Sequence, residues 1–198
     1  MRFIGLDAGS VSVKLVVLDE KSNKLNSHYV RHKGHPLKIA FELLKSVQLS
    51  AVSPLSHPPP SRGEGKGGGE GYLLSDDFSL SITGSAGRLI SSVLGIEPVN
   101  ELVAQAYATQ KLFPHIRTII ELGGEDSKLI LLGESASGGG VKEFSMNSVC
   151  AAGTGSFLDQ QAERLRLTIE EFSDLSLLSK KPPRIAGRCS VFAKSDMI

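Results

Sequence analysis

The sequence predicts a mixed α/β fold, because short strand-like runs alternate with helical periodicity along its 198 residues. Residues 2–7 and 12–18 are apolar and rich in β-branched side chains around a Gly-Ser turn, which predicts two antiparallel strands. Residues 117–122 and 127–132 flank a Gly-Gly turn in the same way. Two strand–turn–strand units therefore anchor the predicted fold.

The remaining elements follow from the same two periodicities. Pro36 suits the first turn of a helix, where its missing N–H costs little. Thr168 and Glu171 have the spacing of a capping box and predict the start of another helix. We expect further strands over 24–32, 78–83 and 141–145, and further helices near Leu89, over 101–112 and over 154–165.

One segment breaks the pattern. Ten of the 21 residues from Ala51 to Gly71 are Pro or Gly. Such a stretch buries too little apolar surface to offset its ordering entropy, so we interpret 51–71 as a disordered insertion. A proline-rich docking peptide is the alternative, although glycine would loosen a polyproline helix.

Composition excludes several classes of function. A formal charge of +1 gives no electrostatic case for a nucleic-acid or membrane partner. The N-terminus reaches Asp7 too early for a signal peptide, and no apolar run approaches the roughly 20 residues that cross a bilayer. We expect a cytoplasmic protein, in which two cysteines serve as ligands or free thiols rather than as a disulfide.

The first Gly-containing turn has the composition of a phosphate-binding loop. Gly9 lets backbone N–H groups approach a ligand closely, Ser10 and Ser12 add hydroxyl donors, and Lys14 adds a cation. Asp7 ends a buried strand and could hold Mg²⁺ through water. An ordinary β-hairpin with a polar tip is the alternative interpretation.

The second turn repeats this design. Gly123 and Gly124 lie between acids, and Asp126 and Lys128 follow. Two such hairpins facing each other would cradle the β- and γ-phosphates of ATP and hold Mg²⁺ between Asp126 and the aspartate of the first hairpin. Glu121 could orient the attacking water or be a solvated surface acid. The pairing of the two hairpins is the strongest indication of nucleotide binding.

Cys150 and Cys189 are the only cysteines, and each precedes a helix-like run. A thiolate near a helix N-terminus is stabilised by the helix dipole. Three interpretations stay open: two buried thiols, a zinc site that lacks nearby histidines, and a [4Fe–4S] cluster shared by a symmetric dimer that supplies four thiolates.

Together these segments resemble the BadF/BadG/BcrA/BcrD-type ATPases, which include the activators of 2-hydroxyacyl-CoA dehydratases and the ATPase subunits of benzoyl-CoA reductase. The Glu-Leu-Gly-Gly-Glu-Asp form of the second hairpin is most similar to the long activase homologues, since short activators carry Asp and Gln where this chain has Glu121 and Glu125. The matching stretches are Gly5–Lys14, Gly84–Arg88, Glu101–Ala106, Glu121–Lys128, Asn147–Phe157 and Gly187–Asp196.

The resemblance implies an actin-like ATPase fold of the acetate kinase–sugar kinase–Hsp70–actin type, with ribonuclease H-like lobes. Residues 1–113 would form the first lobe, and 114–198 the start of an incomplete second lobe. It also implies a homodimer in which Cys150 and Cys189 of each subunit bridge one [4Fe–4S] cluster. Gly153, Thr154 and Gly155 would contact the nucleotide.

The implied activity is ATP-driven transfer of a low-potential electron, received from ferredoxin or flavodoxin, to an iron–sulfur dehydratase or reductase. Two other functions remain open. A metabolite kinase of the same superfamily would need a substrate pocket and a base, which the sequence does not identify. A truncated, non-catalytic ATP-binding module would bind nucleotide without turnover.

Overall fold

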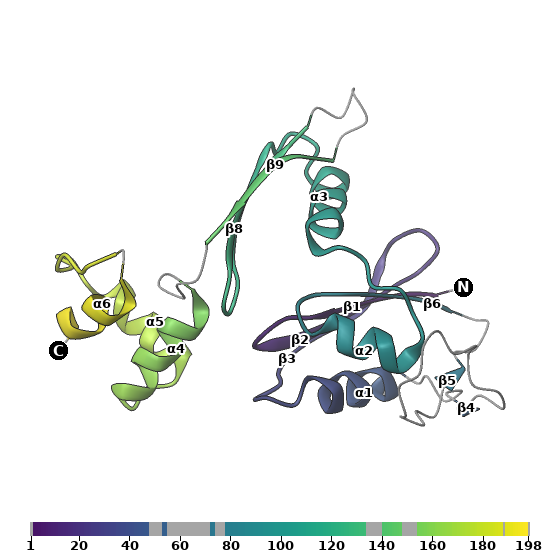
Figure 1. The fold of residues 1–198 in the computed structure, drawn as a ribbon, viewed down its shortest axis with the longest axis horizontal. Coiled ribbons are helices and arrows are strands. Elements are labelled where there is room, and N and C mark those ends of the chain that lie inside the picture. Colours follow the sequence, from purple (N-terminus) through teal and green to yellow (C-terminus); the bar gives the residue numbers. More distant parts are fainter. Residues whose placement is uncertain are drawn as a thin grey trace, which may run out of the picture. The chain divides into compact units, whose positions relative to one another are not determined.

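The computed structural model describes residues 2–47, 53–54, 72–73, 78–133, 140–147, 154–187 and 189–197. The chain divides into two compact units, Met1–Gln105 and Ala106–Ile198, with the boundary inside helix α3 (Glu101–Leu112) (Figure 1). Each unit contains a β-sheet and helices, which confirms the predicted mixed α/β class. We expected this boundary after residue 113, which directly follows the last residue of α3.

The first unit is built on a four-stranded sheet with the order β3-β2-β1-β6. Strands β1 and β2 form the predicted antiparallel hairpin, the expected third strand β3 pairs antiparallel with β2, and β6 pairs in parallel with β1. The parallel pair brings Asp7, near the end of β1, opposite Thr83, the last residue of β6. The strands are β1 (Arg2–Ala8), β2 (Ser12–Leu18), β3 (Lys24–Arg31) and β6 (Phe78–Thr83).

Helices α1 (Pro36–Ser46) and α2 (Gly87–Leu94) cover one face of this sheet (Figure 1). Alternate residues of β1 and β2 point into the core beneath them, so a slip of one residue in register would expose the whole apolar set. The core includes Ile4, Leu6, Ala8, Val13, Leu15 and Val17 from these strands and Ala40, Leu43, Leu44, Ile90 and Leu94 from the helices.

The predicted insertion contains one described element. Strand β4 (Ser53–Pro54) pairs antiparallel with β5 (Tyr72–Leu73), which lies just beyond the insertion. The other residues of 51–71 lie outside the described residues, so the expectation of disorder stays a prediction.

A carboxylate closes the turn between β2 and β3. Asp19 Oδ1 accepts hydrogen bonds from the backbone N–H groups of Lys21 and Asn23, both at 2.8 Å, and Oδ2 accepts from the Asn23 amide at 2.9 Å. The Asn23 side chain is the largest cause of a lowered pKa for Asp19. The carboxylate therefore contributes stability above its ordinary pKa, and this contribution is lost as the pH falls through the lowered value.

The second unit contains a three-stranded antiparallel sheet and three helices after it. The predicted capping box is confirmed: the Thr168 N–H donates to Glu171 Oε2 at 2.8 Å, and the Glu171 N–H donates to Thr168 Oγ1 at 3.1 Å. The elements are β7 (Thr118–Leu122), β8 (Ser127–Leu132), β9 (Val141–Met146), α4 (Gly155–Arg164), α5 (Ile169–Leu177) and α6 (Ser190–Asp196).

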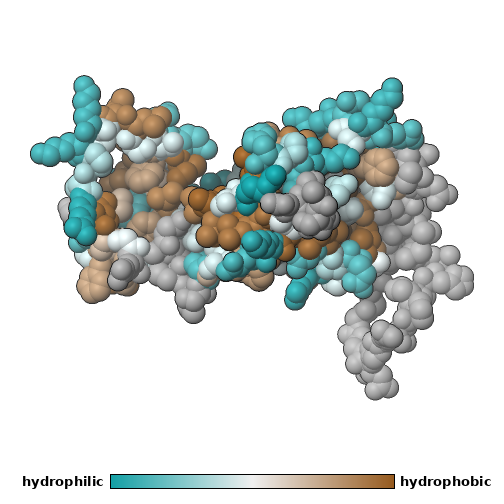
Figure 2. Space-filling view, turned by 90° about the horizontal axis from the view of Figure 1, so that it is seen from above, coloured by the Kyte–Doolittle hydropathy of each residue, from teal (hydrophilic) through white to brown (hydrophobic). Residues whose placement is uncertain are grey.

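One face of the second sheet is apolar and exposed. Ile120 and Leu129 are cross-strand partners with 73% and 42% of their surfaces exposed, and Leu122 is 69% exposed. At the matching positions of the first unit, counted from each hairpin turn, Leu6 and Leu15 are 1% and 2% exposed. Figure 2 shows brown, apolar areas open on the face that it draws. The apolar face of the hairpin is thus covered by helices in the first unit and exposed in the second.

Gly84 provides a test of the first unit's packing. Its φ is +95°, and an added Cβ would contact the Ala8 carbonyl and lie 2.6 Å from Asp7 Oδ1. We expect Gly84→Ala to lower the free energy of unfolding by more than about 3 kcal/mol, since backbone strain and a steric clash combine.

Gly34 is the matched control, because its φ is +85° and nothing lies within 4 Å of an added Cβ. Gly34→Ala should cost about 1 kcal/mol, from strain alone. Denaturant unfolding of both variants measures the difference. Equal losses would mean that the β6–α2 turn does not approach β1 as closely as described.

Candidate functional site

The first hairpin joins an acid and a lysine across its strands. Asp7 and Lys14 are register partners of β1 and β2, and Lys14 Nζ lies 2.7 Å from Asp7 Oδ2. The Gly9 N–H donates to the Ser12 carbonyl at 2.9 Å and closes the turn. Asp7 Oδ1 is buried without a hydrogen-bond partner in the described part of the chain. An oxygen left in this state suits a cation or its bound water, so the site fits Mg²⁺.

His32, which directly follows β3, braces this turn from the third strand. The backbone N–H of His32 donates to the Val11 carbonyl at 3.1 Å, and the ring Nε2 lies 3.2 Å from the Gly9 carbonyl. The side chain is buried, with 7% exposed. Sequence reasoning assigned His32 only to the end of a strand, because nothing local indicates that it returns to the first turn.

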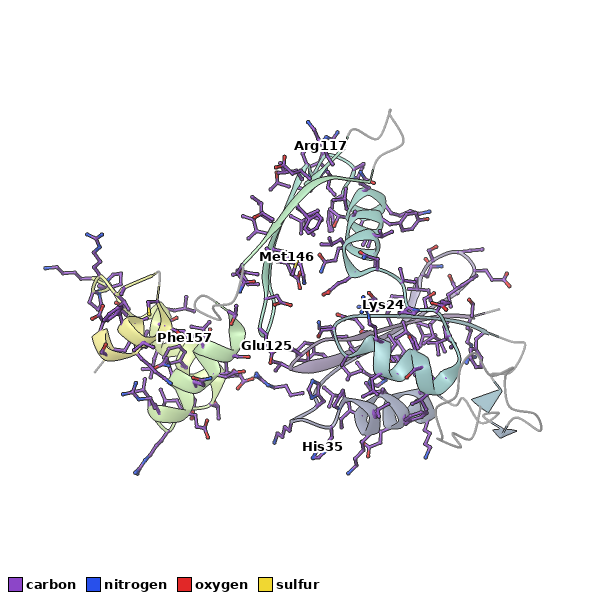
Figure 3. The ribbon with its side chains drawn as sticks, in the orientation of Figure 1. Lys24, His35, Arg117, Glu125, Met146 and Phe157 are labelled. Atoms are coloured by element: carbon purple, nitrogen blue, oxygen red, sulfur yellow. The ribbon has the colours of Figure 1, made fainter. Side chains whose placement is uncertain are left out.

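The second hairpin repeats this geometry. Glu121 and Lys128 are register partners of β7 and β8, and Lys128 Nζ lies 2.7 Å from Glu121 Oε2. The Gly123 N–H donates to the Asp126 carbonyl at 2.8 Å. Figure 3 shows Glu125 at the tip of this hairpin. The two predicted hairpins therefore share a glycine turn closed by the same backbone bond and an acid–lysine pair at the same register.

Asn147, which directly follows β9, braces the second turn as His32 braces the first. Its Oδ1 accepts from the Ser127 N–H at 2.9 Å, and its Nδ2 donates to the Glu125 carbonyl at 3.4 Å. Sequence reasoning placed Asn147 in a family motif without a role. In both hairpins the residue after the third strand fixes the turn.

The two lysines differ in burial. The Lys14 side chain is 46% exposed, whereas that of Lys128 is 6% exposed and its partner Glu121 is 23% exposed. Lys14 can leave Asp7 for a ligand at little cost, because an exposed ion pair contributes little. Departure of Lys128 would leave the partly buried Glu121 carboxylate without this ion pair. The prediction that both lysines bind phosphate therefore has its firmer geometric basis at Lys14.

The start of α4 contacts the second turn directly. The N–H groups of Gly155 and Ser156 donate to the carbonyls of Gly123 and Gly124 at 2.9 and 2.8 Å. Thr154, the N-cap residue, is fully buried. Thr154 and Gly155, both predicted to contact nucleotide, thus lie beside the predicted phosphate loop, and Gly153 lies outside the described residues.

Cys189 is the N-cap residue of α6 and carries a half-buried free thiol. Cys150 lies outside the described residues, so the structure does not test their pairing. No group of three or more His, Cys, Asp or Glu side chains that could hold a metal occurs within the described ranges. Cys189 alone fits one soft thiolate ligand of a shared cluster.

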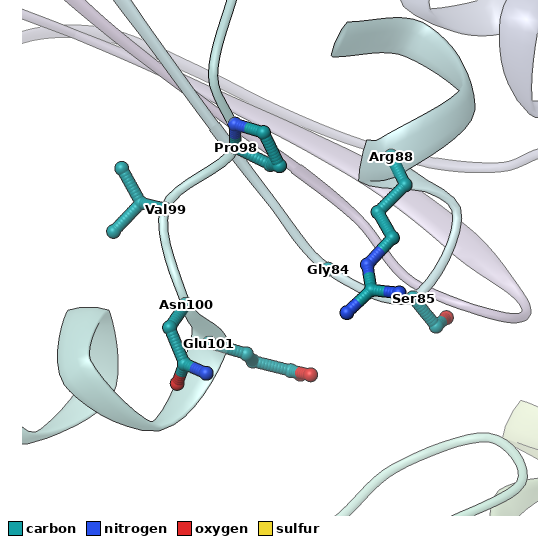
Figure 4. A pocket seen from close by; sticks show the side chains of 7 residues that line it. All are labelled: Gly84, Ser85, Arg88, Pro98, Val99, Asn100 and Glu101. Atoms are coloured by element: carbon teal, nitrogen blue, oxygen red, sulfur yellow. The ribbon is translucent and has the colours of Figure 1, made fainter. Parts of the chain in front are cut away.

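A pocket opens in the first unit, beyond the carboxyl end of β6 (Figure 4). It lies beside the first hairpin, because Gly84 in its wall contacts Asp7 and Ala8. Sequence reasoning quoted Gly84–Arg88 and Glu101–Ala106 as family motifs and gave them no chemical role. The residues that line this pocket are Gly84, Ser85, Arg88, Pro98, Val99, Asn100 and Glu101.

The burial of Lys128 leads to a stability prediction. Lys128→Met should lower the free energy of unfolding by about 2 kcal/mol or more, because Glu121 loses its partner in a partly buried site. Lys14→Met should cost less than about 1 kcal/mol. Denaturant unfolding compares the matched pair. Similar losses for both variants would contradict the difference in burial.

Comparison with known proteins adds independent evidence. The model of the BadF/BadG/BcrA/BcrD ATPase family matches residues 68–198. The activator of lactoyl-CoA dehydratase from Anaerotignum propionicum is 32% identical over 198 residues, which are 100% of this chain and 67% of that protein.

No helix among the described residues is long and apolar enough to span a membrane.

Two solved structures support the fold. The activator of the 2-hydroxyisocaproyl-CoA dehydratase from Clostridium difficile, solved with bound ADPNP, is 27% identical with a TM-score of 0.73, over 99% of this chain and 64% of that one. Ethanolamine utilization protein EutJ from Carboxydothermus hydrogenoformans, 13% identical with a TM-score of 0.51 over 88% and 61% of the two chains, shares the fold alone. The chain thus spans about two thirds of these relatives. It has the predicted actin-like ATPase fold and belongs to the BadF/BadG/BcrA/BcrD ATPase family.

Proposed function

We propose that this chain is the ATP-hydrolysing part of an activator that delivers low-potential electrons to a 2-hydroxyacyl-CoA dehydratase or benzoyl-CoA reductase-type partner. The observation that carries the proposal is the matched pair of hairpins, each with a closed glycine turn and a cross-strand acid–lysine pair. Membership of the family and the activators among its relatives support the same function.

The first hairpin would bind phosphate and Mg²⁺. Gly9 would let the turn approach the ligand closely, since its own N–H is used to close the turn. Ser10 and Ser12 would supply hydroxyl donors, and Lys14 would leave Asp7 to contact a phosphate oxygen. Asp7 would then hold Mg²⁺ through water, with the unpartnered Oδ1 as its free acceptor. When bound there, Mg²⁺ would supply positive charge to offset the negative charge of the phosphates.

The second hairpin would bind the same nucleotide through its own turn. Gly123 and Gly124 allow close backbone approach, Asp126 adds a carboxylate towards Mg²⁺, and Glu121 orients the attacking water. The ion pair at 2.7 Å fixes the Glu121 carboxylate. Lys128 would contribute positive charge behind the loop. Gly153, Thr154 and Gly155 would lie beside the bound phosphates, where the Gly155 N–H holds the turn through the Gly123 carbonyl.

Cys150 and Cys189 of each subunit would together hold one [4Fe–4S] cluster in a homodimer. The bound cluster would carry one electron at a time from ferredoxin or flavodoxin to the partner enzyme. A continuous series of contacts supports coupling between nucleotide and cluster. The second turn bonds to α4, whose Arg164 Nη1 donates to the Lys194 carbonyl of α6 at 3.3 Å. Lys194 Nζ donates back to Gln160 Oε1 at 3.2 Å, and α6 begins after Cys189.

Turnover of MgATP tests the clamp. Asp7→Asn and Asp126→Asn should each lower kcat about 100-fold, because each removes charge from the metal site. Asp174→Asn, an exposed acid on α5, is the matched control and should leave kcat unchanged.

Normal turnover in both site variants would contradict the assignment of the metal site. Nucleotide binding without turnover in the unmodified chain would favour a non-catalytic module. A large stimulation of turnover by a small hydroxylated substrate would favour a metabolite kinase.

Iron content tests the cluster separately. After anaerobic purification, about two irons and two sulfides per chain in a dimer are expected for one shared cluster. Cys189→Ala should remove the iron while circular dichroism remains unchanged, and Asp7→Asn should keep it. Full iron content in Cys189→Ala would disprove the ligand assignment.

A further inference from the structure

The pocket of the first unit has a volume of about 430 Å³ and lies where β6 ends. Two segments form its walls: the turn from β6 into α2, and the segment that enters α3 (Figure 4). Ligands of sheets with parallel strands bind beyond the carboxyl ends of those strands, and the β1–β6 pair is the parallel pair of this sheet. The pocket therefore lies where a ligand is expected.

Arg88 is the cation of this pocket. It occupies the first turn of α2, and its guanidinium points into the open space (Figure 4). Within the described residues it makes no hydrogen bond or ion pair, and its side chain is exposed. A cation in the first turn of a helix is disfavoured by the helix dipole, so local stability does not explain it. An anion in the pocket would.

Glu101 points into the same space from the first turn of α3 (Figure 4). The N-terminus of α3 is already capped, because Asn100 Oδ1 accepts hydrogen bonds from the backbone N–H groups of Leu102 and Val103 at 2.9 and 3.3 Å. The chemistry of the pocket therefore depends on its side chains. A guanidinium and a carboxylate that face one space suit a ligand that is anionic and also carries a proton to donate.

We propose that this pocket binds inorganic phosphate in a protonated form. Arg88 donates to two phosphate oxygens, for which its planar fork is suited. The Glu101 carboxylate accepts the hydrogen bond of the P–OH group, and the Ser85 hydroxyl lies at the rim. Sulfate has the same shape but no proton at neutral pH, so it leaves Glu101 facing a bare oxyanion.

The origin of this phosphate rests on the proposed function, because hydrolysis of ATP beside Asp7 releases phosphate next to the pocket. Gly84 lies between the two, since an added Cβ there would be 2.6 Å from Asp7 Oδ1. The pocket would then retain product phosphate after the bond has broken. Phosphate binding itself does not depend on hydrolysis and is measured without nucleotide.

Calorimetric titration of the full chain with sodium phosphate, and separately with sodium sulfate, tests the proposal. The unmodified chain should bind phosphate at millimolar concentrations and sulfate about tenfold more weakly, because the donor to Glu101 is missing. Arg88→Gln should weaken phosphate binding about tenfold or more. Lys38→Gln is the matched control, since Lys38 is an exposed cation near the start of α1 and should leave binding unchanged.

Glu101→Gln should abolish the preference for phosphate over sulfate, and circular dichroism checks that each variant is folded. Phosphate binding that is unchanged in Arg88→Gln, or absent in the unmodified chain, would overturn the proposal. Equal affinity for sulfate and phosphate in the unmodified chain would also overturn it. Arg88-dependent phosphate binding in a chain that does not hydrolyse ATP would refute the proposed function and leave the phosphate pocket in place.

Discussion

The pairing of an acid and a lysine directly across the two strands of each hairpin is the constraint on which the site depends. The glycine turn shortens the connection so that the two side chains meet on one face, at 2.7 Å in both units. The residue after the third strand then holds each turn in place. Strand register, turn geometry and carboxylate position are thus a single arrangement, and disturbing one disturbs the others.

The two copies of this arrangement differ in what surrounds them. In the first unit the lysine is exposed and the acid has an unpartnered oxygen, so the charges can rearrange around a ligand. In the second unit the lysine is buried, and the turn carbonyls bond to the start of α4. The ion pair of the first hairpin can therefore separate at little cost, whereas the second hairpin is fixed to the start of α4.

The sequence predicted what local patterns determine. Apolar, β-branched runs around a Gly-Ser turn located β1 and β2, and an alternating run located β6. The spacing of Thr168 and Glu171 located the start of α5. The bracing roles of His32 and Asn147 could not be predicted, because each depends on a strand returning to a distant turn. The pocket around Arg88 was missed for the same reason, since its walls join only after β6, α2 and α3 have packed.

The exposed apolar face of the second sheet has a consequence for handling the protein. Soluble monomers seldom leave large apolar patches in water, and Ile120, Leu122 and Leu129 belong to one. Strand β7 also forms an edge of its sheet, so this face adjoins backbone groups that can pair with another strand. Self-association should therefore begin at this sheet, and its rate should rise with protein concentration and with salts that strengthen apolar contacts.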